Sequence, residues 1–524
     1  MNANLKTLIT CLISSFVLAQ QKPNIIYIYA DDLGYGELGC YGQKIIKTPN
    51  IDKLASEGIK FTQHYSGAPV CAPSRCMLMT GKHSGHAYIR GNYEFGDFTD
   101  ENEKGQFPLE ANAFTVAELL KLKGYTTALV GKWGLGYNGT EGMPTKQGFD
   151  YFYGYLDQKQ SHNFYPTHLW ESFSYNYLKQ KETAFINKNT ESGGSKVIST
   201  EYTVKDDLGQ PYINVHGKPL DPKTATQADF DKYKGKVYAP EKMTEKAIGF
   251  ISKNKEKPFF LYLAYTLPHV SLQVKEEWVN KYKGQFDEQP YYGNNGYTPT
   301  MYPKSTYAAM VSYLDAQVGI ILEKISALGL DKNTIVMFSS DNGATFKTGG
   351  FDPTYFNSMA GLRGTKGDLY EGGIRIPFIA KWPDKIAPGQ TSDLISSQID
   401  FFATLADLGG LKKSNTDGIS FLPEIVGKPK KQNKHEYLYF EFPEKGGQVA
   451  IRMGDWKGIK SNMKKNQNAP WEIFNLKNDN KESVNLANQH PELVKIFEEI
   501  TQKEHTTSVI KEWEFIQTKS TSKN

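Results

Sequence analysis

The chain contains four short apolar runs, and each run ends in polar residues of a particular kind. The runs begin at Asn24 (NIIYIYADDLG), Tyr125 (YTTALVGKWGLG), Pro258 (PFFLYLAYTLPHV) and Asn333 (NTIVMFSSDNG). Each is rich in β-branched and aromatic residues and is apolar at consecutive rather than alternate positions. This pattern predicts strands that are buried on both faces, as in a parallel sheet.

Segments with helical spacing lie between these runs. Asn50 is placed to cap a helix over IDKLASEGI, and Thr115 to cap one over VAELLKLKG. Residues 305–329 repeat apolar positions at helical spacing over a longer stretch. Strands that alternate with helices predict an α/β fold, in which a large and mainly parallel sheet carries helices on both faces. Ligands of such folds collect beyond the carboxyl ends of the strands.

Oxygen-bearing side chains end two of the four runs. Asp31 and Asp32 follow the first run, and Asp341 and Asn342 follow the last. Such ligands suit a hard divalent cation, Ca²⁺ or else Mg²⁺, and suit Zn²⁺ poorly. A single Asp-Asp pair is more often a turn or a helix cap, but two such sets at matching strand ends predict a metal site.

Two changes of pattern divide the rest of the chain. Residues from about 170 to 238 are rich in Lys, Thr, Asn and Gly without a strong apolar period, which predicts an insertion, partly a hairpin, over one edge of the site. Strand-like segments and a final helical pattern follow after residue 434. We therefore expect a larger domain with the strand-end residues at 20–430, and a smaller α+β domain with an antiparallel sheet at 431–524.

The first residues have the organisation of an export signal. Lys6 precedes an apolar run over residues 8–18, and Val17-Leu18-Ala19 fits the small-residue rule for cleavage after Ala19. We expect residues 1–19 to be a signal peptide recognised by the export machinery, and the mature protein to be periplasmic or secreted. No later segment reaches the length of a membrane span, so no stable membrane insertion is expected.

Charge and cysteine content narrow the possible roles. The 524 residues carry a net charge of only +4, and lysine-rich patches such as residues 428–434 indicate solvated loops rather than a nucleic-acid surface. Cleavage after Ala19 would leave Cys40, Cys71 and Cys76. An odd number in an oxidising compartment leaves at least one thiol unpaired. We expect Cys76 to be a buried thiol near Cys40, which leaves Cys71 to be explained.

Cys71 lies in the segment VCAPSRCMLMTG, where Pro73 and Ser74 mark the start of a helix. The cysteine then sits at the positive end of that helix, where an anion is favoured. The cationic and donor groups expected at the same rim are Arg75, Lys132, His269 and Lys366. Together with a metal, these groups form a clamp for a tetrahedral, negatively charged ester, either sulfate or phosphate.

The segment Cys71-Ala72-Pro73-Ser74-Arg75, with Leu78 and Thr80-Gly81, resembles the signature of the formylglycine-dependent sulfatases. Other elements of that family occur in the matching order and spacing: Asp31-Asp32, Gly131-Lys132-Trp133, Pro268-His269, Ser340-Asp341-Asn342-Gly343 and Gly364-Thr365-Lys366. The similarity covers nearly the whole mature chain, and the ordered set is far more specific than the cysteine motif alone. It implies the alkaline-phosphatase-like sulfatase fold.

The resemblance also implies a chemistry for these positions. A maturation enzyme oxidises Cys71 to formylglycine, and a hydroxyl of the hydrated aldehyde, bound to Ca²⁺, attacks the sulfur of a sulfate ester. The metal is held by Asp31, Asp32, Asp341, Asn342 and residue 71, and the sulfate oxygens by Arg75, Lys132 and Lys366. His269, with Lys366, protonates the departing alcohol oxygen, and loss of the proton of the second hydroxyl then expels sulfate.

One position departs from the family pattern. The family has Gly-Lys-Trp-His-Leu-Gly, and Gly134 stands here in place of the histidine that acts as the base in sulfate release. Three outcomes are open: a non-catalytic protein that binds sulfated glycans, a slower enzyme, or a base supplied from elsewhere. His83 and His86 are the nearest alternatives in sequence, and a relocated base is our working hypothesis.

The sequence says less about the substrate. The segment QSHNFYPTHLW is dense in histidines and aromatic residues, and we select His162, His168 and Trp170 as candidates for binding a sugar. The alternative is that they only pack the insertion onto the core. The general pattern resembles bacterial polysaccharide sulfatases, which implies a sulfated galactose unit of an algal galactan or a mucin-type glycan. A phosphonate monoester or phosphodiester hydrolase is the alternative activity, because it shares the fold.

Overall fold

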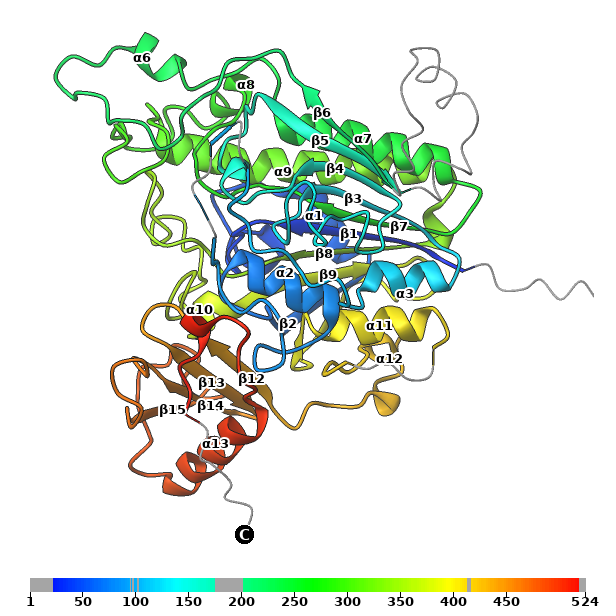
Figure 1. Ribbon diagram of the computed structural model, residues 1–524, viewed down its shortest axis with the longest axis vertical. Helices are drawn as coiled ribbons and strands as arrows, with labels where there is room; N and C mark the ends of the chain where they lie inside the picture. The colour runs from blue at the N-terminus through cyan, green and yellow to red at the C-terminus, as the bar shows by residue number, and fades with distance from the viewer. Residues whose placement is uncertain are drawn as a thin grey trace, which may run out of the picture.

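A computed structural model describes residues 22–94, 96, 99–100, 103–174, 201–411 and 416–517. The expected signal peptide at residues 1–19 lies outside the described residues, as does part of the expected insertion. The described chain forms two sheets, a large one that is sandwiched between helices and a small one near the C-terminus (Figure 1). None of the helices in these ranges is long and apolar enough to cross a membrane.

The large sheet contains eleven strands. Their bounds are β1 Asn24–Ala30, β2 Ile59–Tyr65, β3 Thr126–Lys132, β4 Tyr151–Tyr155, β5 His168–Ser174, β6 Glu201–Asp207, β7 Phe259–Ala264, β8 Thr334–Ser340, β9 Arg375–Lys381, β10 Gln390–Ser392 and β11 Ser396–Ser397. The order is β10-β2-β9-β8-β1-β7-β3-β4-β5-β6, and β11 also pairs with β2. The centre, from β8 to β4, is parallel, whereas β9 and β5 run antiparallel to their neighbours. The predicted, mainly parallel sheet is confirmed.

The four apolar runs are the four central strands β1, β3, β7 and β8, and each is buried almost throughout. In β1, Ile26 and Ile28 pack into the core on one face of the sheet. Ile25 and Tyr27 pack into the core on the other face. Because both faces are covered, every position from Ile25 to Ala30 is apolar, and this explains why the runs lack alternation.

Helices cover both faces of the large sheet, as predicted (Figure 1). One layer consists of α1 Pro49–Ser56, α7 Ala239–Asn254, α8 Glu276–Val279 and α9 Pro303–Ala327. The other consists of α2 Cys71–Thr80, α3 Val116–Leu122, α11 Asp400–Leu408 and α12 Leu422–Ile425. Two further short helices are α6 Gln227–Asp231 and α10 Glu371–Ile374.

The helix starts were predicted with mixed success. Thr115 caps α3 as expected and forms a capping box with Glu118. The prediction for Asn50 was wrong, because α1 begins at Pro49 and its N-cap is Thr48, two residues before the predicted cap. Proline is favoured at the first helical position, where its missing N–H costs nothing. The side chain of Asn50 instead donates to Asp315 Oδ2 of α9 at 2.8 Å.

The cysteines do not pair in the described chain. Cys76 is fully buried among the helices of one face, and burial raises the pKa of its thiol to about 12. Cys40 packs against the core of the opposite face. The expectation that these two thiols lie near each other is therefore wrong, because the sheet separates them.

The C-terminal region contains the predicted antiparallel sheet. Its strands are β12 Leu438–Phe442, β13 Gln448–Met453, β14 Trp456–Lys460 and β15 Trp471–Asn475, and they pair in sequence order. The helix α13 (Pro491–Glu504) packs its Leu493 and Phe497 against this sheet. In the expected insertion, β5 and β6 form an antiparallel pair at the edge of the large sheet, as a hairpin would.

Candidate active site

The register of the central strands brings the predicted residues to one edge of the sheet. Ala30 at the end of β1 pairs with Ser340 at the end of β8, so Asp31 and Asp341 follow at the same level. β7 lies between β1 and β3, and β3 ends at Lys132 at the same edge of the sheet. Ligand-binding side chains of a parallel sheet collect at this carboxyl edge, which is where the sequence placed them.

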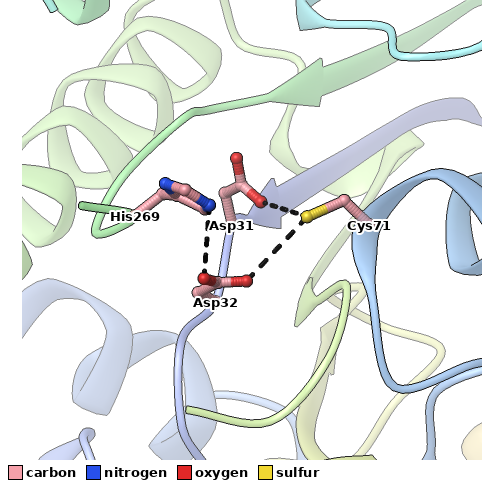
Figure 2. A group of neighbouring side chains, drawn as sticks. All are labelled: Asp31, Asp32, Cys71 and His269. Atoms are coloured by element: carbon pink, nitrogen blue, oxygen red, sulfur yellow. Dashed lines mark hydrogen bonds and ion pairs between the residues drawn. The ribbon is translucent and has the colours of Figure 1, made fainter. Parts of the chain in front are cut away.

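Cys71 is the first residue of α2, as predicted, and points into the same space (Figure 2). Its Sγ atom lies 3.5 Å from Asp31 Oδ1 and 4.0 Å from Asp32 Oδ1. The ammonium of Lys366 lies 3.4 Å from the same sulfur. Cys71 therefore lies where the carboxyl ends of the central strands meet the positive, N-terminal end of α2.

Three cations and three carboxylates form ion pairs near Cys71, and all six side chains are nearly inaccessible to solvent. The pairs are Arg75 Nη2 to Asp341 Oδ2 at 2.9 Å, Lys132 Nζ to Asp31 Oδ2 at 2.8 Å, and Lys366 Nζ to Asp32 Oδ2 at 2.8 Å. Buried charges are tolerated only when they are paired in this way. The structure thus brings together all five predicted catalytic residues and all the predicted metal ligands.

The carboxylates respond differently to this environment. Burial acts to raise the pKa of Asp31, but the charges of Lys132, of His269 when it is protonated at acid pH, and of Arg75 outweigh it and hold that pKa well below its usual range. Burial, followed by the negative charge of Asp31, raises the pKa of Asp341 to about 7. Two carboxylates this close compete for the same positive charges, which is the situation that a divalent cation relieves.

The donor set fits a hard divalent cation. Asn342 donates through Nδ2 to Asp32 Oδ1 at 2.8 Å, while its Oδ1 is buried and has no hydrogen-bond partner among the described residues. Ligand atoms of Asp31, Asp32, Cys71 and His269 all lie within 4.8 Å of one another. An unpaired amide oxygen beside buried carboxylates is the oxygen-rich arrangement that Ca²⁺ or Mg²⁺ requires.

His269 is oriented by its own backbone neighbourhood. Its Nδ1 bonds the carbonyl oxygen of Val270, which leaves Nε2 facing Lys366 Nζ at 3.1 Å and Asp32 Oδ2 at 3.4 Å. Burial, together with the charge of Lys366, lowers the pKa of His269 to about 4. The imidazole is therefore neutral near pH 7, and its Nε2 accepts a hydrogen bond from the Lys366 ammonium.

Of the three predicted sugar-binding residues, only His162 reaches the site. Its ring stacks on that of His269, with centroids 4.5 Å apart and planes 9° from parallel. Two residues that sequence reasoning missed join it: the rings of Tyr297 and His216 lie 5.6 and 6.0 Å from that of His162. The left-handed backbone of Tyr297, with φ +65°, cannot be foreseen from the sequence, and His216 belongs to the expected insertion.

His168 and Trp170 are structural residues, which corrects the prediction. Both lie on β5 and are 5 and 7% exposed. His168 Nε2 lies 2.6 Å from Glu103 Oε1, and Trp170 Nε1 donates to Glu103 Oε2 at 2.8 Å. A buried carboxylate needs hydrogen-bond donors, and both rings are occupied in bonding Glu103.

His83 and His86 are also placed away from the reacting centre. Cys71 begins α2 and both histidines follow its end, so a helix of 10 residues, about 15 Å long, separates them from the cysteine. His83 Nε2 lies 3.0 Å from Glu504 Oε2, and His86 Nδ1 lies 3.0 Å from Asp417 Oδ2. Neither can take a proton directly from residue 71, and the hypothesis of a base relocated to either histidine is wrong.

The loop around Lys132 contains two glycines with different constraints. A Cβ atom on Gly131 would lie 1.8 Å from the carbonyl oxygen of Ala264, so only glycine fits there. A Cβ atom on Gly134, where φ is +75°, would lie 3.1 Å from Gln158 Cγ and 3.8 Å from Arg75 Cδ. Gln158, which the sequence did not single out, thus fills the space beside the position where the family has histidine.

Comparison with known proteins agrees with this geometry. Residues 23–411 match the family model described as Sulfatase, and residues 365–509 match that described as N-sulphoglucosamine sulphohydrolase, C-terminal. The chain is 32% identical to arylsulfatase A of Homo sapiens over 466 residues, covering 86% of this chain and 77% of that one. It is 30% identical to N-acetylgalactosamine-6-O-sulfatase of Bacteroides thetaiotaomicron over 524 residues, covering 92% of each.

Solved structures show the same similarity. The crystal structure of Ps i-CgsB in complex with k-i-k-neocarrahexaose has a TM-score of 0.68 and 27% identity, and the similarity covers 96% of both chains. With the match over residues 23–411 and the site geometry, this chain belongs to the sulfatase family and is a sulfuric ester hydrolase.

Proposed function

We propose that this protein is an exported carbohydrate sulfatase, which uses Ca²⁺ and a formylglycine that a maturation enzyme makes from Cys71. The observation that carries the proposal is the position of Cys71, whose Sγ lies within 4.0 Å of two carboxylates and the Lys366 ammonium. Burial raises the pKa of this thiol well above its usual value, so the cysteine itself would be a neutral, weak nucleophile. The hydrate of an aldehyde at this position supplies a hydroxyl nucleophile instead.

The metal ligands in this proposal are Asp31, Asp32, Asp341 and Asn342. Bound Ca²⁺ supplies a Lewis acid that lowers the pKa of a coordinated hydroxyl. The unpaired Oδ1 of Asn342 and the crowded carboxylates support this assignment. Once these carboxylates have another cation for a partner, Arg75, Lys132 and Lys366 are available to hold the oxygens of a sulfate group.

The pair of Lys366 and His269 is suited to deliver a proton to the departing alcohol oxygen. Burial acts to lower the pKa of Lys366, but the charge of Asp32 outweighs it and raises that pKa well above its usual value, so the ammonium keeps its proton. The neutral His269 accepts a hydrogen bond from it at 3.1 Å. A proton held between two nitrogens beside the reacting centre is the arrangement required of a general acid.

The substrate class is proposed from relatives. One is named for N-acetylgalactosamine 6-O-sulfate, and another was crystallised with a neocarrahexaose. We propose a sulfated galactose unit, as in an algal galactan or a mucin-type glycan. The rings of His162, His216 and Tyr297 lie together next to His269 and offer flat surfaces on which a sugar can pack.

The test is a screen with enzyme that has been produced together with a formylglycine-generating enzyme. Sulfated galactose and N-acetylgalactosamine monosaccharides and sulfated oligosaccharides are scored for desulfated product by mass spectrometry, with Cys71→Ala as the control. Formylglycine at position 71 and product from at least one sugar are expected. Turnover of an aryl phosphonate with none of the sulfated sugars would contradict the proposal. Detection of the protein in the periplasm or the medium of producing cells tests the proposed export.

Gly134 favours a second candidate, a protein that binds sulfated glycans without turnover, because the family's base is missing there. The same screen separates the two. Binding of a sulfated oligosaccharide by protein that carries formylglycine, without product after prolonged incubation, would support the binding protein. Any product that depends on Cys71 would exclude it.

A further inference from the structure

The loop between β4 and β5, residues 156–167, places two unpaired polar side chains beside catalytic residues. These are Gln158 and His162, and neither side chain makes a hydrogen bond within the described ranges. The polar side chains on either side of Gln158 differ, because each has a partner: Asp157 Oδ1 accepts from two backbone amides, although its Oδ2 is enclosed without a hydrogen bond, and Lys159 pairs with Glu94. Two side chains in one short loop therefore remain available for a ligand.

The backbone fixes Gln158 beside Arg75. The pairing of β3 with β4 continues past the strand ends, where Gly134 N donates to the carbonyl oxygen of Leu156 at 3.1 Å. Gln158 follows two residues later, and its Cγ lies 3.1 Å from the position of a Cβ on Gly134. Arg75 Cδ lies 3.8 Å from that same point. The side chain, 5% exposed, thus occupies the space that a residue at position 134 would enter.

His162 lies against His269, on which its ring stacks. Its Nδ1 is enclosed and has no hydrogen-bond partner in the described part of the chain. Leaving such an atom unpaired costs about 1–3 kcal/mol. His162 as a whole is half-buried, and its other nitrogen, Nε2, is not among the enclosed atoms, so Nε2 is the nitrogen that a ligand can reach. Burial, the neighbouring His269 and the two lysines lower the pKa of His162, so its ring is uncharged near neutral pH.

Uncharged donors and acceptors discriminate between the parts of a sulfated sugar. Arg75, Lys132 and Lys366 provide fixed positive charge for the sulfate group. An amide and a neutral imidazole each offer both a donor and an acceptor, which matches a hydroxyl group better than an anion. The flat rings of Tyr297 and His216 next to His162 offer a surface for the sugar ring itself.

We propose that the loop between β4 and β5 forms the subsite for the sugar hydroxyls that flank the sulfate, with Gln158 beside Arg75 and His162 beside His269 as its hydrogen-bonding residues. In this arrangement Gln158 takes the space that the family gives to a histidine and uses it for recognition rather than proton transfer. The inference rests on the proposed carbohydrate activity, and it assigns substrate specificity to two residues outside the metal site.

The experiment measures binding in the Cys71→Ala background, where no turnover can occur. Titration calorimetry uses galactose 4-sulfate, galactose 6-sulfate, N-acetylgalactosamine 6-sulfate and inorganic sulfate as probes. Gln158→Met keeps the length of the side chain without its amide, and His162→Phe keeps the ring on His269 without its nitrogens. We expect each substitution to weaken the best sulfated sugar by roughly 10- to 100-fold, and inorganic sulfate by less than about threefold.

Several outcomes would overturn the inference. Unchanged affinity for the sugar in both variants would do so, and so would an equal loss for inorganic sulfate, which would place the residues on the sulfate group. Retention in His162→Phe with loss in His162→Ala would show that the ring only positions His269. If the parent binds none of the three sugars, the carbohydrate proposal fails and this inference fails with it. Gln158→Ala replaces Gln158→Met if the latter does not fold.

Discussion

Two regions of this molecule bury closely paired cations and carboxylates, and only one of them is a site. The second region, here called the domain junction, consists of Glu371 of α10, Lys457 of β14, Glu482 and Arg375. Lys457 Nζ lies 2.9 Å from Glu371 Oε1 and 3.0 Å from Glu482 Oε1. Arg375 lies 3.3 Å from the other oxygen of Glu371. These distances match those between the cations and carboxylates around Cys71.

The pKa values of the two regions are also alike. At the junction, burial acts to raise the pKa of Glu371, but Lys457 and the arginines lower it, while burial raises the pKa of Glu482 to about 7. Asp31 and Asp341 show the same split. The difference lies in what the buried atoms face. Glu482 Oε2 accepts from the backbone N–H of Glu371, and Oε1, which makes no hydrogen bond, lies 3.0 Å from the Lys457 ammonium. Asn342 Oδ1 and His162 Nδ1 have neither a hydrogen bond nor an ion pair in the described chain. Perturbed pKa values alone therefore do not mark a site, and here the site differs from the junction in having uncharged buried atoms without a partner beside its charges.

The largest expected effect comes from removing the residue that the junction lacks. Cys71→Ala should lower turnover of a sulfated sugar by on the order of 10⁴-fold or more, because no nucleophile remains at the end of α2. Sulfate release measures this, and thermal unfolding should show little change. Cys40→Ala, a matched substitution outside the site, should keep wild-type turnover. Turnover by Cys71→Ala within about tenfold of the wild type would contradict the assignment.

The same substitution in each region separates activity from stability. Lys366→Met should lower turnover by roughly 10²- to 10⁴-fold, because it removes a sulfate contact and the proton held against His269. Initial rates at saturating substrate measure the loss. A fall in the substrate affinity alone, with turnover intact, would argue against a role for Lys366 in proton delivery.

At the junction, Lys457→Met should lower the free energy of unfolding by about 3–5 kcal/mol, because Glu371 and Glu482 are then buried without their shared partner. Denaturant unfolding measures this, and turnover per folded molecule should be unchanged. If the variant does not fold, the double variant Lys457→Met with Glu371→Gln should recover part of the loss. A selective loss of turnover in folded Lys457→Met would show that the junction and the site are coupled.

The sequence predicted the part of this picture that follows from strand ends. Asp31 and Asp341 follow buried strands directly and Lys132 is the last residue of one, so their place at one edge of the sheet could be inferred from periodicity. The order of antiparallel strands towards the edges could not, because it depends on long-range pairing.

As a set, the proposed sugar-binding residues, Gln158, His162, His216 and Tyr297, were predicted poorly for a physical reason. They lie in loops whose positions depend on tertiary contacts, such as the left-handed backbone of Tyr297 and the packing of Gln158 against Gly134. His168 and Trp170 looked equally suitable in sequence, but Glu103, 65 residues away from the first of them, engages both. Composition shows which residues can bind a ligand, and only the fold shows which are already bonded.

Removing the metal should have an effect of intermediate size, and only the site around Cys71 should respond to it. Ca²⁺ at about 100 times its dissociation constant should stabilise the protein by about 2.7 kcal/mol. Chelation should lower the unfolding midpoint and Ca²⁺ should restore it. Asn342→Leu, which removes the unpaired oxygen, should abolish most of this response. Glu371→Gln at the junction should respond to Ca²⁺ like the wild type, and an equal loss of response there would contradict the metal assignment.

The smallest expected effect tests why Gly134 is a glycine. Gly134 and Gly124 have nearly the same φ, +75° and +77°, but a Cβ on Gly124 meets nothing within 4 Å, whereas one on Gly134 lies 3.1 Å from Gln158 Cγ. Alanine at either position should cost about 1 kcal/mol of stability, because the left-handed backbone disfavours a side chain. Only Gly134→Ala should also raise the KM for a sulfated sugar, since it displaces Gln158. Equal KM values in the two variants would show that Gln158 does not contact the substrate. Glycine at position 134 would then be required only for its backbone conformation.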